Sequence, residues 1–122
     1  MGRAFEEAMG AAGGSASTWL VVLSLKTGSP RTQAELAAAV GVQGPTMTHH
    51  LDGLEQSGLV TRERDPSNRR AQQVRLTEAG EAMFHRLRAA AVAFDRRART
   101  GLSGPEEAEL RRLLDVLHAN VV

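Results

Sequence analysis

Apolar residues recur along most of this chain at the spacing of amphipathic helices. The clearest case is Met47, Leu51 and Leu54, whose i, i+4, i+7 spacing puts them on one helical face. The apolar runs are short, WLVVL at residues 19–23 being typical. None approaches the roughly 20 residues that a membrane helix needs. The pattern predicts a mainly α-helical domain that does not enter a membrane.

Capping residues mark where the expected helices begin. Thr32 and Glu35 have the Ser/Thr-x-x-Glu spacing of a capping box, and Ser103 and Glu106 repeat it. Glycine and proline residues are placed to end or start other helices. The remaining helix starts are expected at Ser17 or Thr18, Pro45 and Thr77. In chain order, the expected helices cover residues 3–12, 18–27, 32–40, 45–57, 78–100 and 104–121.

A two-stranded hairpin is expected after the fourth helix. Residues 59–64 and 71–76 have the composition or the alternation of strands, and Asp, Pro, Ser and Asn at residues 65–68 are typical of a turn. The stretch 58–77 holds five arginines and two acidic residues, in a chain whose formal net charge is only +1. The two helices before it are joined by a tight turn that contains Gly41. A helix-turn-helix followed directly by an arginine-rich hairpin predicts a winged helix-turn-helix.

The length of 122 residues suits one domain or one protomer of an assembly. We expect residues 18–77 to form the winged helix-turn-helix, and residues 1–17 and 78–122 to supply long terminal dimerisation helices. A winged helix this small has little core of its own to cover the apolar stripe of the last helix, so a second copy is expected to cover it. The expected dimerisation residues are Leu110, Leu113, Leu114, Leu117 and Val121.

Composition excludes several classes of function. The chain contains no cysteine, which excludes disulfides, thiolate metal sites and thiol redox sensing and suits a cytoplasmic protein. The N-terminal segment contains acids and lacks a continuous apolar region, so it is not expected to be a signal peptide. No nucleophile elbow or phosphate-binding loop occurs. Adjacent His49 and His50 diverge by about 100° on a helix and do not make a chelate. We therefore expect a protein that is not an enzyme, without catalytic residues, metal or cofactor.

Residues 32–84, TQAELAAAVGVQGPTMTHHLDGLEQSGLVTRERDPSNRRAQQVRLTEAGEAMF, closely resemble the MarR (multiple antibiotic resistance regulator) family of dimeric winged-helix transcription factors. The resemblance extends from about Trp19 to the C-terminus, and its most specific parts are PTMTHHLDGLE, GLVTRERDP and VRLTEAG. It implies a homodimer with one recognition helix per protomer in a major groove of double-stranded DNA and each wing in a minor groove. It also implies a pocket for a small aromatic ligand between the dimer helices and the winged helix. The expected function is sequence-specific repression at a pseudo-palindromic operator, relieved by a ligand.

Three features depart from the pattern of that family. Asn68-Arg69 stands at the wing tip where the family usually has an Asp-Arg pair, and an amide supplies no charge. Only 18 residues precede Trp19, so the first dimer helix is short. The recognition helix has no Arg or Lys over residues 45–56, and His49 stands where an arginine is common. The wing is therefore expected to compensate for a recognition helix without fixed positive charge.

Helix geometry assigns the residues expected to contact DNA. With the apolar triplet facing inward, Thr46 and His49 face outward and can meet base edges. Thr48 and Gln43 lie near the start of the same helix and can bond phosphate or bases, and the start of the preceding helix can hold a phosphate. The wing-tip arginines suit the negative potential of a minor groove. The expected DNA-binding residues are Thr32, Gln43, Thr46, Thr48, His49, Arg62, Arg64, Arg69 and Arg70.

Alternatives stay open for the overall role and for three side chains. Residues 31–58 hold one basic residue against Glu35, Asp52 and Glu55, which suits a winged helix that binds protein without reading DNA. Asp52 and Glu55 either partner neighbouring side chains or repel unsuitable DNA. Trp19 either belongs to the core, the more frequent role of a lone tryptophan, or lines the effector pocket.

Overall fold

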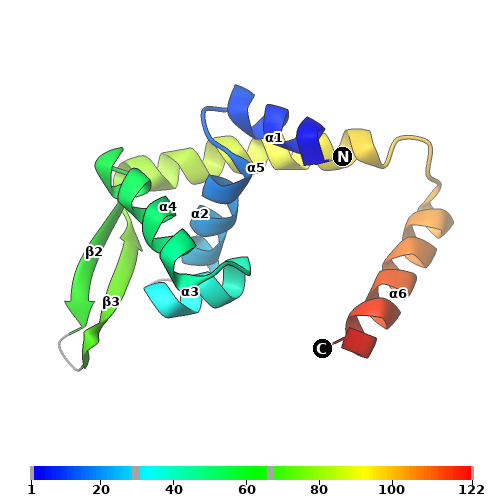
Figure 1. The fold of residues 1–122 in the computed structure, drawn as a ribbon. Coiled ribbons are helices and arrows are strands. Elements are labelled where there is room, and N and C mark those ends of the chain that lie inside the picture. Colours follow the sequence, from blue (N-terminus) through cyan, green and yellow to red (C-terminus); the bar gives the residue numbers. More distant parts are fainter. Residues whose placement is uncertain (1, 29–30, 66–67, 122) are drawn as a thin grey trace. The chain divides into compact units, whose positions relative to one another are not determined.

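The structure, a computed structural model, describes residues 2–28, 31–65 and 68–121, and the side chains of all of these except residues 65, 68–71 and 121. The described chain is mostly helical with a small antiparallel sheet (Figure 1), so the predicted fold class of a winged helix-turn-helix is confirmed. The predicted turn residues Pro66 and Ser67 lie outside the described residues. The elements are α1 (Gly2–Ala11), α2 (Ala16–Gly28), β1 (Arg31–Thr32), α3 (Gln33–Val40), α4 (Gly44–Gln56), β2 (Val60–Asp65), β3 (Asn68–Leu76), α5 (Glu78–Ala98) and α6 (Gly104–Val121).

The chain divides into two compact units, Met1–Ala91 and Val92–Val122, with the boundary inside α5. The first unit holds the helix-turn-helix and the wing, and the second holds the end of α5 together with α6. Among the described residues, no single helix is long and apolar enough to cross a membrane, although α1 and α2 meet the length and composition criteria as a pair bent by 73°.

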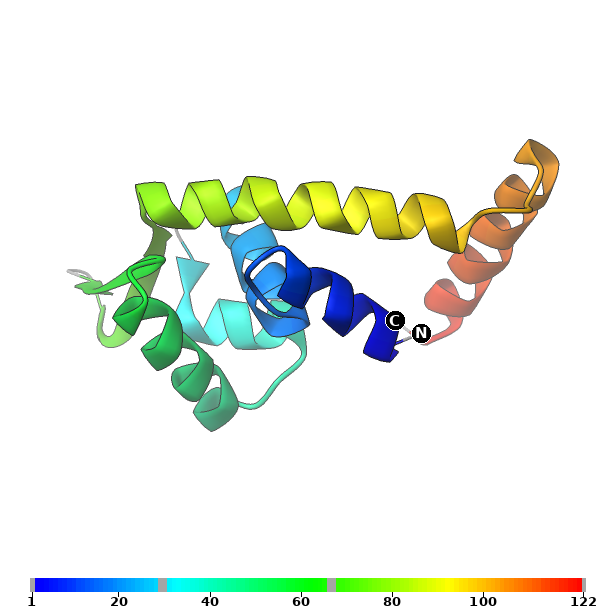
Figure 2. The ribbon, with the colours of Figure 1, turned by 90° about the horizontal axis from the view of Figure 1, so that it is seen from above.

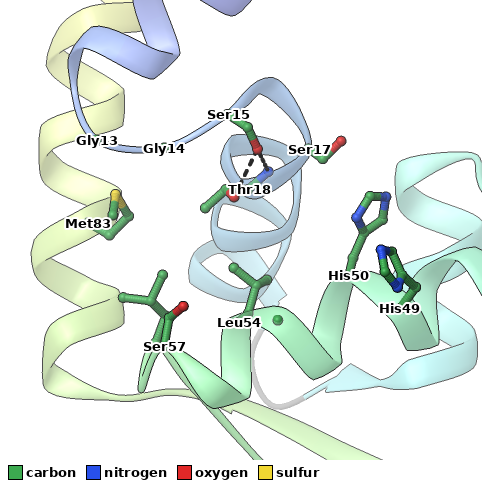
Figure 3. Close-up of a pocket in the computed structure, with 12 residues that line it drawn as sticks. Gly13, Gly14, Ser15, Ser17, Thr18, His49, His50, Leu54, Ser57 and Met83 are labelled. Atoms are coloured by element: carbon green, nitrogen blue, oxygen red, sulfur yellow. Dashed lines mark hydrogen bonds between the residues drawn. The ribbon is translucent and has the colours of Figure 1, made fainter.

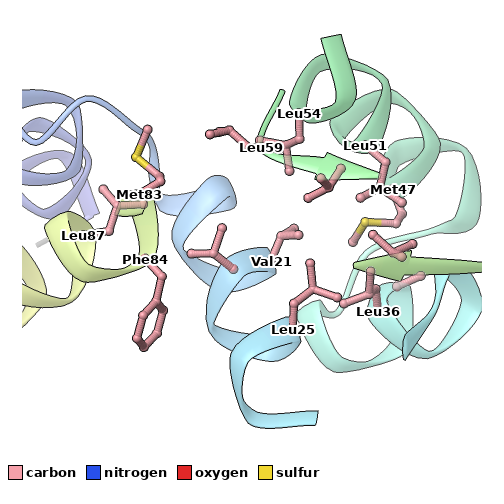
Figure 4. Close-up of a cluster of buried hydrophobic side chains, with 14 of the residues drawn as sticks. Val21, Leu25, Leu36, Met47, Leu51, Leu54, Leu59, Met83, Phe84 and Leu87 are labelled. Carbon is pink, nitrogen blue, oxygen red and sulfur yellow. The ribbon is translucent and has the colours of Figure 1, made fainter. Parts of the chain in front are cut away.

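The core of the first unit is centred on α2, which lies between α5 on one side and α3 and α4 on the other (Figure 4). Val21 and Leu25 of α2 are fully buried. Met47, Leu51 and Leu54 of α4 are also buried, as their spacing predicted. Truncating one such leucine to alanine typically destabilises a protein by about 2–5 kcal/mol. These contacts therefore hold α4 firmly by one face and leave its opposite face to solvent.

The wing is a three-stranded antiparallel sheet in the order β1-β3-β2. β2 and β3 form the predicted hairpin, in which Arg62 pairs with Val74. β3 begins at Asn68, earlier than predicted, so the strand includes the wing-tip arginines. β1 was not predicted, and its Arg31 pairs with Val74 from the other side. A strand of two residues shows no alternation in a sequence, and its existence depends on tertiary pairing.

Both predicted capping boxes are confirmed. At the start of α3, the Glu35 amide donates to Thr32 Oγ1 at 3.1 Å and the Thr32 amide donates to Glu35 Oε1 at 3.1 Å. Ahead of α6, the Glu106 amide donates to Ser103 Oγ at 3.2 Å and the Ser103 amide donates to Glu106 Oε1 at 2.9 Å. Each box satisfies two backbone donors that a helix start would otherwise leave unpaired.

The prediction that Ser17 or Thr18 caps α2 is wrong. The helix begins at Ala16, and Ser15 Oγ accepts a hydrogen bond from the Thr18 amide at 3.0 Å. The Ala16 amide donates to the carboxylate of Glu6 in α1 at 3.3 Å. A contact between two helices thus helps to set this boundary, and the local sequence pattern does not show it.

Gly80, in the first turn of α5, packs against the base of the wing. A Cβ at this position would lie 2.1 Å from the carbonyl oxygen of Leu59. That oxygen accepts from the Thr77 amide at 3.1 Å. Thr77 Oγ1 donates to the carbonyl oxygen of Gly58 at 2.6 Å and accepts from the Gly80 amide at 3.1 Å, which confirms Thr77 as the cap of α5. Figure 2 shows α5 starting beside the wing and running across α2.

Candidate nucleic-acid interface

The exposed face of α4 is polar, and the helix contains no lysine or arginine. Thr46 and His49 are exposed, and Gly53 has open space where a side chain would begin. Gln43 is the N-cap residue of α4, and its exposed side chain makes no capping hydrogen bond. Hydroxyl, imidazole and amide groups on a firmly held helix can therefore hydrogen-bond to an external partner, as base edges require.

Thr48 is tied to the start of α3. Its hydroxyl donates to the carbonyl oxygen of Gly44 at 3.1 Å and accepts from Gln33 Nε2 at 2.5 Å. Sequence reasoning considered the side chain of Thr48 by itself and overlooked that of Gln33, because the bond joins two helices. The only hydroxyl proton of Thr48 goes to Gly44, so the amide nitrogen of Gln33 must be the donor in the bond between the two side chains. The amide oxygen of Gln33 is not used in that bond and can accept a hydrogen bond from another group.

Thr32 serves the capping box of α3 with both its hydroxyl and its amide. The backbone hydrogen bond from Thr32 holds the pKa of Glu35 below its ordinary value of about 4.5, so this carboxylate is charged at neutral pH. The predicted phosphate contact at this helix start therefore has to be made beside a negative charge. Amides later in the first turn, rather than that of Thr32, are the donors left for it.

Arg62 of β2 reaches back to α4. Its Nη2 lies 2.6 Å from Asp52 Oδ1 and 2.9 Å from Glu55 Oε1, and its side chain is only 15% exposed. The hydrogen bond from Arg62 lowers the pKa of Glu55 below its ordinary value. Both carboxylates thus partner a neighbouring side chain, one of the two roles considered for them. The sequence shows two acidic residues three positions apart on α4, which places them on neighbouring parts of the helix surface. It does not show that Arg62 is their partner, because that contact depends on the path of β2 relative to α4.

Among the other predicted DNA-binding arginines of the wing, the side chain of Arg64 is described, whereas only the backbone of Arg69 and Arg70 is. Arg64 is exposed on β2 and pairs in register with Gln72 on β3. Arg69 and Arg70 lie within β3, but their side chains are outside the part of the chain whose side chains are described. The backbone of the hairpin therefore carries three of the predicted DNA-binding arginines along two adjacent strands.

A pocket of about 400 Å³ lies along one flank of α4, facing the start of α2 and the side of α5 (Figure 3). Ser15 Oγ, on its rim, is already engaged with Thr18, donating to Thr18 Oγ1 at 3.0 Å. None of the residues that line the pocket is acidic, and none is lysine or arginine. Its polar groups are hydroxyls, backbone and imidazoles, and its apolar groups come from α4, α5 and Leu59, the residue before β2. The lining residues are Gly13, Gly14, Ser15, Ser17, Thr18, His49, His50, Gly53, Leu54, Ser57, Leu59 and Met83.

His49 and His50 both line this pocket although they diverge on the helix. Their ring centroids are 6.3 Å apart and the rings are inclined by 48°. His49 is exposed and His50 is half-buried, as expected for a residue on the flank of α4. No group of three or more His, Asp or Glu side chains that could hold a metal ion occurs in the described part of the chain.

Trp19 is half-buried and packs against the core. Its indole stacks on Phe84 of α5, with centroids 5.8 Å apart and planes inclined by 21°. Trp19 is not among the residues that line the pocket. Its packing agrees with the core role that sequence reasoning favoured.

The last helix carries an exposed apolar stripe. Leu110, Leu113, Leu114 and Leu117 are 45%, 46%, 55% and 62% exposed in the single chain, and the side chain of Val121 lies outside the described ones. Fully burying one leucine is worth about 1.5–3 kcal/mol. A stripe of this size in water favours a partner helix.

Comparison with known proteins agrees with this architecture. The model of the MarR family matches residues 15–71. The transcriptional repressor CouR, solved bound to a 23-mer DNA duplex, has 27% identity and a TM-score of 0.86, covering 96% of this chain and 83% of its own. A mutant of MarR from E. coli, solved with operator DNA, has 25% identity and a TM-score of 0.86, covering 95% of this chain and 84% of its own.

A third structure shares the fold at lower identity. PcaV of Streptomyces coelicolor, solved with its natural ligand, has 20% identity and a TM-score of 0.82, covering 96% of this chain and 85% of its own. Regulators of this family are generally DNA-binding proteins without enzymatic activity. Residues 15–71 thus match the MarR family, and the chain as a whole has the winged-helix fold of DNA-binding transcription regulators of that family.

Proposed function

We propose that the protein is a cytoplasmic repressor that binds a pseudo-palindromic operator as a homodimer and leaves it when a small aromatic ligand binds. The observation that carries the proposal is the exposed polar face of α4, held from behind by the core and flanked by an arginine-bearing wing. CouR, which has the same fold and 27% identity, is a transcriptional repressor.

In the proposed complex, α4 lies in the major groove. Thr46 and His49 meet base edges, because hydroxyl and imidazole groups can donate to and accept from them. Gln43 and the start of α3 near Thr32 lie at the groove entrance, where they meet phosphate or bases, and Thr48 orients Gln33 beside them. These contacts fix the register of α4 and supply the discrimination between sequences.

The wing supplies the fixed positive charge that α4 lacks. Arg69 and Arg70 enter a minor groove, whose negative potential attracts guanidinium groups. Arg64, which is exposed on β2, neutralises a phosphate. Most of the salt dependence of binding should therefore come from the wing.

Homodimerisation follows from the stripe on α6, which needs a covering surface. Leu110, Leu113, Leu114 and Leu117, with Val121, pair with the same helix region of a second copy. A twofold dimer reads two half-sites about one helical turn, ~34 Å, apart. The operator is therefore expected to be pseudo-palindromic.

Release by ligand rests on the pocket along the flank of α4. Its volume of about 400 Å³ lies within the range of roughly 300–1,000 Å³ that is typical of small-molecule sites. His50 and Leu54 bring α4 itself into the pocket wall. A ligand that binds better when α4 is displaced would shift the dimer away from its DNA-binding state.

A mobility-shift assay with the chain's own upstream DNA, run at two salt concentrations, tests the function. Preferential binding of that DNA over a scrambled duplex is the expected result. Equal binding of both duplexes would leave only non-specific attraction. The absence of any shift would favour the second candidate, a winged helix that binds protein, which the exposed carboxylates of Asp52 and Glu55 on α4 support.

A further inference from the structure

Arg62 occupies a place in the wing that no other described arginine shares. It extends from the middle of β2 and contacts two carboxylates, Asp52 and Glu55, that lie almost one turn apart on α4. Its strand is paired to β3 at Val74, whose side chain is fully buried in the core. One guanidinium therefore connects the helix that would lie in the major groove to the strand that leads to the wing tip.

The geometry keeps Arg62 away from phosphate. It makes two charge-assisted bonds, of 2.6 and 2.9 Å, and only 15% of its side chain is exposed, whereas Asp52 and Glu55 are 60% and 43% exposed. Little of the Arg62 side chain is open to a phosphate, and a phosphate that approached it would meet two exposed carboxylates at the same place. Arg64, two residues further along the same strand face, is exposed.

We propose that Arg62 is a positioning residue that fixes the wing relative to the recognition helix, so that both elements meet their grooves in register. Asp52 and Glu55 are then required partners, because they hold the guanidinium. We call the cluster of Arg62, Asp52 and Glu55 the strut. It favours binding because the wing is ordered before it meets DNA, which lowers the entropy lost on association. The inference rests on the proposed DNA-binding function and adds a division of labour within the wing.

The two roles of Arg62 predict different changes in DNA affinity when its acidic partners are neutralised. Asp52→Asn with Glu55→Gln removes both negative partners and leaves Arg62 intact. If Arg62 positions the wing, this double variant should lower the ratio of operator affinity to scrambled-DNA affinity by about fivefold to tenfold, the range for a small ion-pair network. If Arg62 instead contacts phosphate, freeing it should tighten binding to both duplexes and leave their ratio unchanged.

Arg62→Gln completes the cycle. The strut predicts that Arg62→Gln lowers the ratio by the same factor, and that adding it to the double variant changes nothing further. A phosphate-binding role predicts weaker binding to both duplexes and a salt dependence reduced by about one unit of log K per log salt for each phosphate that is no longer neutralised. Arg75→Gln, which removes an exposed arginine from β3, is the matched control for loss of charge in the wing. It should leave the ratio unchanged.

A distance measurement tests the strut without DNA. The chain has no cysteine, so Gln56→Cys on α4 and Gln72→Cys on β3, both exposed, take spin labels at two defined sites. The distance distribution between the labels should broaden in the Asp52→Asn, Glu55→Gln background and in Arg62→Gln. An unchanged distribution in both backgrounds would overturn the proposal. This result is independent of DNA binding, so failure of the strut and failure of the proposed function can be told apart.

Discussion

The side chain of Gln33, the first residue of α3, donates from Nε2 to the hydroxyl of Thr48 on α4 at 2.5 Å. The two helices of the helix-turn-helix are thus linked at the end that would enter the groove. Because Thr48 also donates to the Gly44 carbonyl, its hydroxyl proton is already used. We infer that Thr48 acts on DNA chiefly by orienting Gln33.

Thr48→Val keeps the shape of the side chain and removes the hydroxyl. We expect operator affinity to fall by about 1 kcal/mol, the usual value of one hydrogen bond, with little change in stability because Thr48 is exposed. Gln33→Ala should have a similar effect, and the double variant should be no worse than either single one. Titration of a labelled operator duplex measures this, with Thr48→Ser as the control that retains the hydroxyl. Additive losses would show that each side chain contacts DNA separately.

His49→Ala should relax the choice of one base pair in each half-site. The imidazole is exposed on the outward face of α4, and removing a good hydrogen bond to a base edge costs roughly 1–3 kcal/mol. Selection from a randomised operator library measures the change as one position that loses its preference. His50→Ala, on the half-buried flank, is the control and should keep that preference. An equal loss of affinity for operator and scrambled DNA would assign His49 to phosphate.

Arg69→Ala should weaken binding to operator and scrambled DNA alike. A permanent charge in a minor groove acts on any sequence, and its loss should reduce the salt dependence by about one unit of log K per log salt for each arginine removed from the groove. Binding isotherms over a series of salt concentrations measure the slope. Arg88→Ala, an exposed arginine of α5, controls for the change in net charge. A loss confined to the operator would move sequence reading from α4 to the wing.

Leu113→Asp with Leu117→Asp should yield monomers or insoluble protein. Both side chains lie in the exposed stripe of α6, and each carboxylate would have to be buried in the dimer at high cost. Sedimentation or light scattering measures the mass. Ala119→Asp adds the same charge on the opposite face of α6 and should leave the dimer intact. A wild-type chain that is monodisperse, monomeric and still binds operator would rule out the proposed dimer.

Glu35 should contribute to stability in a manner that depends on pH. Its pKa is lowered in the fold by the Thr32 backbone bond, so the charged form favours folding. The contribution is therefore present above the ordinary pKa of about 4.5 and is lost as the pH falls through the folded value. Glu35→Gln keeps the oxygen acceptor and removes the charge. Its difference from wild type in urea unfolding should be measurable at pH 7 and vanish in acid; a difference independent of pH would contradict the capping explanation.

Most of the helical framework could be predicted because it depends on local spacing. Met47, Leu51 and Leu54 define the buried face of α4 by themselves, and the capping boxes at Thr32 and Ser103 are complete within four residues. Winged-helix architecture then followed from the order of elements. These features share one property, which is that the interacting groups are close in sequence.

The parts that were missed depend on contacts between distant residues. β1 exists because Arg31 pairs with Val74, and α2 starts early where Glu6 accepts from the Ala16 amide. Arg62 could be assigned only as a wing cation, since its two carboxylate partners become visible only when β2 folds back along α4. Candidate site residues were thus identifiable by type and face, whereas the pairs they form were not.

Gly80 has a genetic consequence. Even alanine would place a carbon against the Leu59 carbonyl, where 2.1 Å leaves no room for it. In a random-mutagenesis screen for lost regulation, codon 80 should therefore behave as an essential glycine although it lies on neither the groove-facing side of α4 nor the stripe of α6. Clones with a change there should contain little of the protein, and second-site suppressors should fall around Leu59 and Leu76, the neighbours that would have to yield. Such alleles would show that the close contact between the wing and α5 is required in living cells.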